Sequence, residues 1–157
     1  FEGSEGTKVV KDIEKSKVKS IVKNTNMIRY ILKKPGLFDR KETYEIYTEI
    51  TSNNIPLYHF RSNDDIEFYI TKDNRNKLEK ILETKYSQFK YEDSKKVKLS
   101  VIGYGITNDN KCLLKITDIL SKEKIEVISI DMSQTKIELI VNDIDDSIVK
   151  KLHDELI

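Results

Sequence analysis

The fold is decided by Val18-Lys19-Ser20-Ile21-Val22, a strand-like run that stands ahead of a chain repeating one pattern twice. From Met27 to Tyr91, short β-rich runs alternate with stretches of helical spacing in the order β-α-β-β-α-β. The same order starts again at Val97 and stops after a helix at Ile157, one strand short. The early run is the obvious candidate for the missing strand.

A missing last strand has a physical cost in this arrangement. In a β-α-β-β-α-β sandwich the last strand lies beside the first and covers its hydrogen-bonding edge. Without it, the strand Val97–Val101 would present unpaired N–H and C=O groups. We therefore predict that the N-terminal strand completes the sheet of the second repeat. The expected fold class is α+β, with two ferredoxin-like (βαββαβ) units, antiparallel sheets, helices on one face, and interleaving by the N-terminal strand.

This reasoning also predicts the division of the chain. Residues 1–16 are expected to be a leader from a preceding domain, and residues 17–25 the strand that completes the second unit. Residues 26–93 are expected to form the first unit and residues 94–157 the second.

The composition gives little support to several classes of partner. Lys and Arg number 28 and Asp and Glu 27, so the charge gives no reason to expect nucleic acid or an acidic membrane. No apolar run approaches the roughly 20 residues that cross a bilayer. One cysteine cannot form an intramolecular disulfide, and with two histidines it is too few for a zinc site. A reducing, cytoplasmic setting is expected.

Residues that could carry catalysis are few and scattered. Gly103-x-Gly105 follows a strand and precedes a helix, but Asn108 replaces the third glycine of a dinucleotide turn, so a permissive turn is expected. Cys112 falls on the apolar face of a helix, where a core role is expected. His59 and His153 are isolated and are expected to pack or to lie at the surface. No catalytic residue and no metal ligand is predicted.

Two strand-to-helix loops are the best candidates for a binding site. The segments Lys33–Lys41 and Gly103–Lys111 each precede a helix, whose free N–H groups and dipole favour an anion such as an amino-acid carboxylate. The alternative, that both loops are plain connections, stays open on chemistry alone.

Several segments, in order, resemble the C-terminal regulatory region of aspartokinases, which is built from tandem ACT domains. Val101–Ile106 is similar to that family's V-x-G-x-G-M strand, and Lys124–Ile130 to its G-I-N-I-x-x-I strand. Thr135–Val141 is similar to the I-K-I-S-V-V-V strand, and Val149–Leu156 to the closing A-V-x-x-L-H-x-x-F helix. Glu5–Val9 resembles the P-G-T-L-I segment at the end of the kinase domain, which assigns the leader to that domain.

The resemblance implies an allosteric, amino-acid-sensing domain of an enzyme that phosphorylates aspartate with ATP, in the biosynthesis of lysine, threonine, methionine and diaminopimelate. The stretch itself is then non-catalytic and holds no cofactor, because ATP and Mg belong to the kinase domain. The implied partners are an effector (lysine, threonine or meso-diaminopimelate), the chain's own kinase domain, and a second copy in a homodimer through the ACT units.

The resemblance also implies where the effector binds. Its carboxylate is expected to meet N–H groups of the first loop, and its ammonium to meet oxygens at the start of the next strand. The residues expected at effector sites are Pro35, Gly36, Leu37, Phe38, Asp39, Arg40, Pro56, Leu57, Tyr58, Ile106, Thr107, Asn108, Asp109 and Ser129.

Two other functions remain open. An ACT-type dimerisation module without a working effector site is favoured by Asn110-Lys111 and by Tyr58, which depart from the family's pattern. A free-standing enzyme or an RNA-binding ferredoxin-like domain would need a catalytic cluster or a basic, aromatic sheet face.

Overall fold

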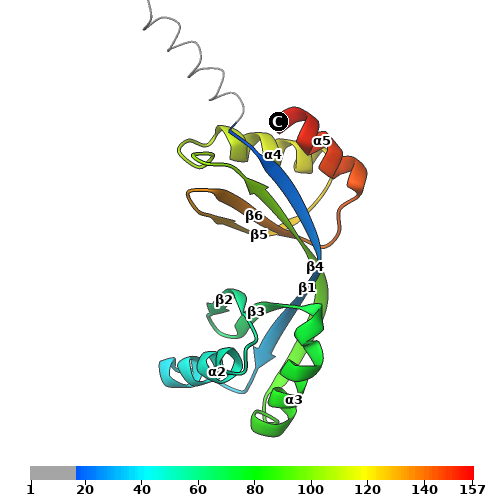
Figure 1. The fold of residues 1–157 in the computed structure, drawn as a ribbon. Helices are drawn as coiled ribbons and strands as arrows, with labels where there is room; N and C mark the ends of the chain where they lie inside the picture. Colours follow the sequence, from blue (N-terminus) through cyan, green and yellow to red (C-terminus); the bar gives the residue numbers. More distant parts are fainter. Residues whose placement is uncertain (1–16) are drawn as a thin grey trace, which may run out of the picture. The chain divides into compact units, whose positions relative to one another are not determined.

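The structure, a computed structural model, describes residues 17–157 (Figure 1). The expected leader, residues 1–16, lies outside the described residues. The elements, in chain order, are β1 (Ser20–Lys33), α2 (Arg40–Ser52), β2 (Tyr58–Ser62), β3 (Ile66–Thr71), the 3-10 helix η1 (Lys72–Asn74), α3 (Arg75–Lys85), β4 (Lys90–Ile102), α4 (Lys111–Lys122), β5 (Val127–Met132), β6 (Lys136–Val141) and α5 (Asp146–Leu156). Within residues 17–157, none of these helices has the length and apolar character to span a membrane.

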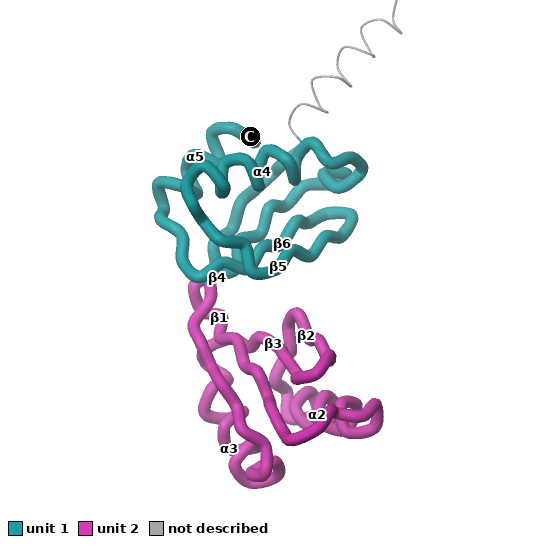
Figure 2. The backbone as a smooth tube through the Cα atoms, turned by 180° about the vertical axis from the view of Figure 1, so that it is seen from behind, with its two compact units in different colours: residues 1–24, 97–157 teal, residues 25–96 magenta. Residues whose placement is uncertain are grey.

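The chain forms two compact units (Figure 2). Unit 1 contains the described residues up to Asn24 together with Val97–Ile157, and unit 2 contains Thr25–Lys96. Strands β1 and β4 each contribute residues to both units, because the boundaries fall inside them.

In unit 1 the sheet order is β1-β4-β6-β5. The N–H of Lys19 donates to the carbonyl oxygen of Ile102 at 2.7 Å, which places the N-terminal run beside the end of β4. On its other side β4 pairs antiparallel with β6, with Val97 opposite Val141. The N-terminal strand therefore covers the edge of β4, and the predicted interleaved α+β fold is confirmed.

The core of unit 1 follows from the alternation along β4. Val97, Leu99 and Val101 point to the sheet face that α4 and α5 cover (Figure 1). Their partners include Ile116 from α4 and Leu152 from α5, both fully buried. Side chains two apart on a strand and four apart on a helix share a face, which is why this pattern yields one apolar layer.

Unit 2 repeats the arrangement with sheet order β2-β3-β1-β4 and with α2 and α3 on one face (Figure 1). Its core is aromatic at the centre: the rings of Tyr30 and Phe68 stack with centroids 5.9 Å apart. The Tyr30 hydroxyl donates to a Glu79 carboxylate oxygen at 3.0 Å. Burial, reinforced by that bond, raises the pKa of Tyr30, so the hydroxyl keeps its proton and remains a donor.

Two strands are longer than the sequence pattern predicts. The apolar runs Val18–Val22 and Met27–Leu32 read as separate strands, and Glu92–Lys96 reads as a polar break, but β1 and β4 continue through these places. The polar residues lie where each strand passes from one unit to the other, and they are exposed or half-buried. Residues between two cores need no apolar side chains, so the alternation that marks a strand is lost there.

Candidate functional site

The first loop, between β1 and α2, is anchored to the core of unit 2. Gly36 makes the turn with φ +78°, a left-handed conformation that favours glycine. Phe38 is 7% exposed, and its ring meets the ring of Phe89 edge-on with centroids 5.2 Å apart. The ammonium of Lys34 lies 5.2 Å from the Phe38 ring centroid. Phe38, one of the expected effector residues, is therefore a core residue that fixes the loop.

The start of α2 is closed by a capping box. The Asp39 carboxylate accepts the Glu42 N–H at 2.7 Å, and the Glu42 carboxylate accepts the Asp39 N–H at 3.3 Å. Glu42 also accepts the Lys34 ammonium at 2.5 Å. Of the N–H groups that a helix start leaves free, those of Arg40 and Lys41 remain for a ligand. The two carboxylates make this end less favourable to an anion than the bare helix start implies.

The expected strand residues Pro56–Tyr58 lie at the other end of unit 2. Both β1 and β2 are antiparallel to β3, so β2 runs in the direction of β1 and its start is remote from the loop that follows β1. The end of β2 is the part near α2, where the hydroxyl oxygens of Ser62 and Thr43 are 3.0 Å apart. Tyr58 pairs with Tyr69 and Ser62 with Ile66, which are three residues, or roughly 10 Å, apart along β3. A single copy of unit 2 does not bring the two parts of the expected site together.

The second loop, between β4 and α4, is tied to the turn between β5 and β6. The N–H groups of Gly103 and Gly105 donate to the carbonyl oxygens of Thr135 at 2.8 Å and Gln134 at 3.2 Å. The Thr107 hydroxyl donates to the carbonyl oxygen of Ser133 at 2.8 Å. These groups hold the loop in place, and the Thr107 hydroxyl keeps only its acceptor lone pairs for a ligand.

Ser129 lies away from the second loop. It faces Ile140 at a β-bulge in β5, and Ile140 in turn faces Lys98 on β4. The loop starts after Ile102, four residues or roughly 13 Å further along β4. The Ser129 hydroxyl is buried and has no hydrogen-bond partner within residues 17–157. The structure does not join it to the loop residues with which it was expected to act.

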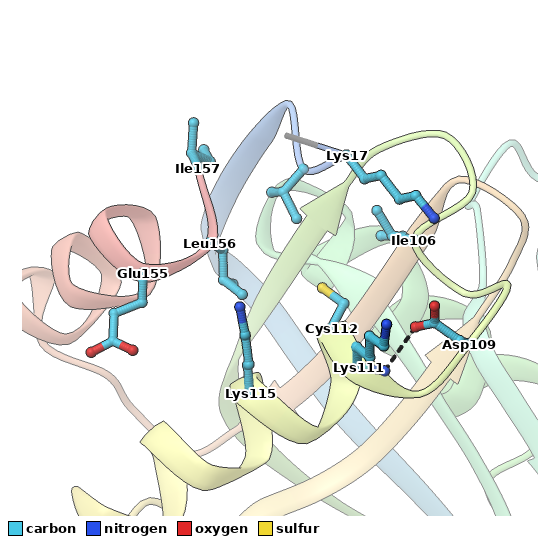
Figure 3. Close-up of a pocket in the computed structure, with 10 residues that line it drawn as sticks. Lys17, Ile106, Asp109, Lys111, Cys112, Lys115, Glu155, Leu156 and Ile157 are labelled. Atoms are coloured by element: carbon cyan, nitrogen blue, oxygen red, sulfur yellow. Dashed lines mark hydrogen bonds between the residues drawn. The ribbon is translucent and has the colours of Figure 1, made fainter. Parts of the chain in front are cut away.

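A cavity of about 480 Å³ lies in unit 1, beside the second loop (Figure 3). It is lined by Lys17, Val18, Ile106, Asp109, Lys111, Cys112, Lys115, Glu155, Leu156 and Ile157. Of the expected effector residues, Ile106 and Asp109 line it. The remaining lining residues come from the N-terminal segment, from α4 and from the end of the chain at α5. These segments are far apart in the sequence, so no local motif marks the cavity.

Cys112 lies at the base of this cavity. It is half-buried and packs against the core of unit 1, as expected, and its sulfur points toward the open space (Figure 3). Burial raises the pKa of its thiol, while the charge of Lys115 acts in the opposite direction. The thiol is therefore protonated at neutral pH and is a poor nucleophile in the folded chain.

We expect alkylation of Cys112 by iodoacetamide to reach half its maximal rate at a higher pH in the folded chain than in the urea-unfolded chain. The thiolate is the reacting form, and burial holds the folded pKa above the ordinary 9.0. Because the folded pKa is the higher one, the buried thiol stabilises the fold below that ordinary value. This stabilisation is lost as the pH rises through the folded pKa. Intact-mass measurement of the rate across alkaline pH checks this, and equal midpoints in the two states would contradict it.

The two histidines singled out in the sequence lie on β2 and α5. Within residues 17–157, no group of three or more His, Cys, Asp or Glu side chains is placed to hold a metal ion. His59 lies in β2 with φ +51°, its ring edge-on to Tyr69 at 5.6 Å. His153 is exposed on α5.

Comparison with known proteins identifies similar chains. No protein-family model matches this sequence. It is 30% identical to an aspartokinase of Rickettsia felis over 152 residues, which is 90% of this chain and 37% of that protein. An aspartokinase of Rickettsia conorii matches with the same identity and coverage. The chain therefore spans well under half the length of these relatives.

Solved structures show the same fold. The ligand-free regulatory subunit of aspartate kinase from Thermus thermophilus matches with a TM-score of 0.76 and 13% identity, over 90% of this chain and 99% of that one. E. coli aspartokinase III in complex with lysine and aspartate, in its T-state, matches with a TM-score of 0.63 and 15% identity, over 89% of this chain and 33% of that one. The resemblance predicted from the motifs is confirmed: the chain is similar in sequence to aspartokinases and has the fold of their regulatory domains.

Proposed function

We propose that this chain is the allosteric regulatory region of an aspartokinase and that it senses an amino acid at a site built between two copies of unit 2. The proposal is supported by the sequence similarity and by the placement of the expected site residues. The loop Pro35–Arg40 and the strand start Pro56–Tyr58 lie at opposite ends of one unit, so a small molecule can touch both only if a second copy supplies one of them.

Unit 2 offers a surface for that second copy. Leu37, Tyr44 and Tyr47 are 67%, 71% and 41% exposed on the loop and the outer side of α2, beside the edge strand β2. Large apolar side chains gathered at a sheet edge favour pairing between copies. A homodimer through this surface would bring the loop of one copy toward β2 of the other.

The charges at the loop favour one of the three expected effectors. An α-carboxylate can accept the N–H groups of Arg40 and Lys41, while the carboxylates of Asp39 and Glu42 suit a nearby cation. Lysine carries a second ammonium and only one carboxylate, unlike threonine or meso-diaminopimelate. E. coli aspartokinase III has been solved with lysine. Lysine is therefore the effector we propose.

The whole protein would phosphorylate aspartate with ATP and Mg bound in a kinase domain that this chain does not include, and would work in the cytoplasm. Control of that domain requires that the effector prefer one arrangement of the ACT units, with a typical coupling of about 1–3 kcal/mol.

Titration of the chain with lysine, threonine and meso-diaminopimelate tests the proposal. We expect lysine to raise the melting temperature, because a ligand of the native state at a hundred times its Kd adds about 2.7 kcal/mol of stability. Threonine is expected to have a smaller effect. Replacing Tyr44 by Lys is expected to dissociate the dimer and to remove the lysine response, whereas replacing Tyr104 in unit 1, which is still more exposed, by Lys is not. Thermal melting checks the response to lysine, and sedimentation of the same variants checks whether the dimer dissociates.

A second function is favoured by the capping box at Asp39 and Glu42, which occupies part of the helix start. The chain would then be a dimerisation module without a working effector site. A stable dimer whose melting temperature is unchanged by all three amino acids would select this function and would overturn the sensing proposal.

A further inference from the structure

The cavity of unit 1 is bordered by three lysines whose ammonium groups have no partner among the residues that the structure describes. Lys17, Lys111 and Lys115 make no side-chain hydrogen bond or ion pair with any residue in 17–157. By contrast, Lys23 and Lys151 of the same unit pair with Asp146 at 3.0 Å and Glu123 at 3.1 Å. The three unpaired cations come from the N-terminal segment and from α4, and Figure 3 shows them around one opening.

The charge around the opening suits a single negative charge. Two side-chain carboxylates, Asp109 and Glu155, also border the cavity, so that among the lining side chains the three lysines are in excess by one positive charge. Asp109 is already engaged, because it accepts the backbone N–H of Lys111 at 2.9 Å (Figure 3). The start of α4 adds partial positive charge at the same place. A monoanion balances this set better than a dianion.

The base of the cavity is apolar. Val18, Ile106 and Leu156 are 5%, 2% and 8% exposed, and the half-buried Cys112 lies among them. A volume of about 480 Å³ falls within the range of small-molecule pockets. An aliphatic body of a few carbons would cover these side chains while its charged end stays at the lysines.

We propose that this cavity binds a small aliphatic monocarboxylate, with its carboxylate at Lys17, Lys111 and Lys115 and its aliphatic body over Ile106, Cys112 and Leu156. The site lies within unit 1 and uses neither the first loop nor β2. The inference therefore goes beyond the proposed amino-acid site in unit 2 and does not depend on it.

Cys112 provides a direct readout, because it is the only cysteine of the chain. The test measures alkylation of the full chain by iodoacetamide, a neutral reagent, with and without 4-methylpentanoate. We expect the rate to fall about fivefold at a concentration four times Kd, since only the unoccupied fraction reacts. The matched amide, 4-methylpentanamide, has the same body without the charge and is expected to protect much less. Equal protection by acid and amide, or protection by neither, overturns the proposal.

Leucine separates this site from an amino-acid site. It carries the same branched body and a carboxylate, but its ammonium makes it a zwitterion. Stronger protection by leucine than by 4-methylpentanoate would overturn the monoanion assignment. Equal protection by inorganic phosphate would overturn the role of the apolar base.

Lysine variants test which ammonium groups bind the carboxylate of the ligand. The double substitution Lys111→Gln and Lys115→Gln is expected to raise the Kd for 4-methylpentanoate, measured by this protection, at least fivefold, whereas Lys150→Gln, at an exposed position of α5, is expected to leave it unchanged. Protection is taken as the ratio of rates within each variant, because removing Lys115 itself changes the thiol reactivity. In Cys112→Ser, a rise in melting temperature with the acid and not with the amide gives a readout independent of the thiol. Protection unaltered in the double variant would overturn the site.

Discussion

Gly103→Ala is expected to unfold unit 1 or to destabilise it by more than about 3 kcal/mol, the upper end of ordinary overpacking. A Cβ on Gly103 would lie 2.0 Å from the carbonyl oxygen of Lys17 and 2.8 Å from Cγ2 of Ile106. The first of these atoms belongs to the backbone that pairs with β4 and cannot move without weakening the bond between Lys19 and Ile102. The close approach of two strands, rather than a special φ, makes glycine necessary at this position.

Gly36→Ala is the matched control. An added Cβ there would meet nothing within 4 Å, so its cost is only that of the left-handed backbone, about 1–2 kcal/mol. Urea unfolding followed by the reactivity of Cys112 reports on unit 1 alone, because no other thiol is present. The unit 1 midpoint is expected to fall sharply for Gly103→Ala and to be unchanged for Gly36→Ala. A similar midpoint for both variants would contradict the assigned role of Gly103.

A fragment of residues 97–157 is expected not to fold. It contains both helices and three strands of unit 1 but lacks the N-terminal strand that covers β4. It also lacks Val18 and Ile21, which pack into the unit 1 core. The free edge of β4 and the loss of buried apolar area both lower the stability of the fragment. A domain of this size has little stability to lose.

Restoring the strand is expected to restore the fold. β1 and β4 run in opposite directions, since Lys19 meets Ile102 while the side chain of Lys33 reaches Glu92. Residues 17–24 can therefore be joined to 97–157 by a two-residue Asn-Gly hairpin that replaces unit 2. Circular dichroism and urea unfolding of the two fragments make the comparison. Cooperative unfolding of the shorter one would show that unit 1 needs no strand from the N-terminal segment.

Counting strands was enough to predict the interleaving, because an uncovered edge at Val97–Val101 requires a partner and the Val18–Val22 run was the spare one. The continuity of β1 and β4 could not be predicted in this way. Residues such as Asn24 and Asp93 belong to polar strand segments between two cores, where no alternation exists to detect. Exposed polar residues in a strand and in a turn are alike in sequence.

The candidate site was predictable only in part. Helix starts after the two loops pointed to anion binding, and Asp39-x-x-Glu42 is a local motif that could have revealed the capping box which limits it. Predicting that Tyr58 and Ser129 lie away from the two loops requires the strand directions and the pairing register, which the sequence pattern does not give. The cavity could not be found at all, since Lys17, Lys115 and Leu156 meet only through the packing of segments distant in sequence.

Strands β1 and β4 are hydrogen-bonded neighbours and both pass through the two units. A slip of one residue between them would turn the inward side chains of the slipped strand outward in both units. The pairing register of these two strands is therefore held by the apolar pattern of each unit independently.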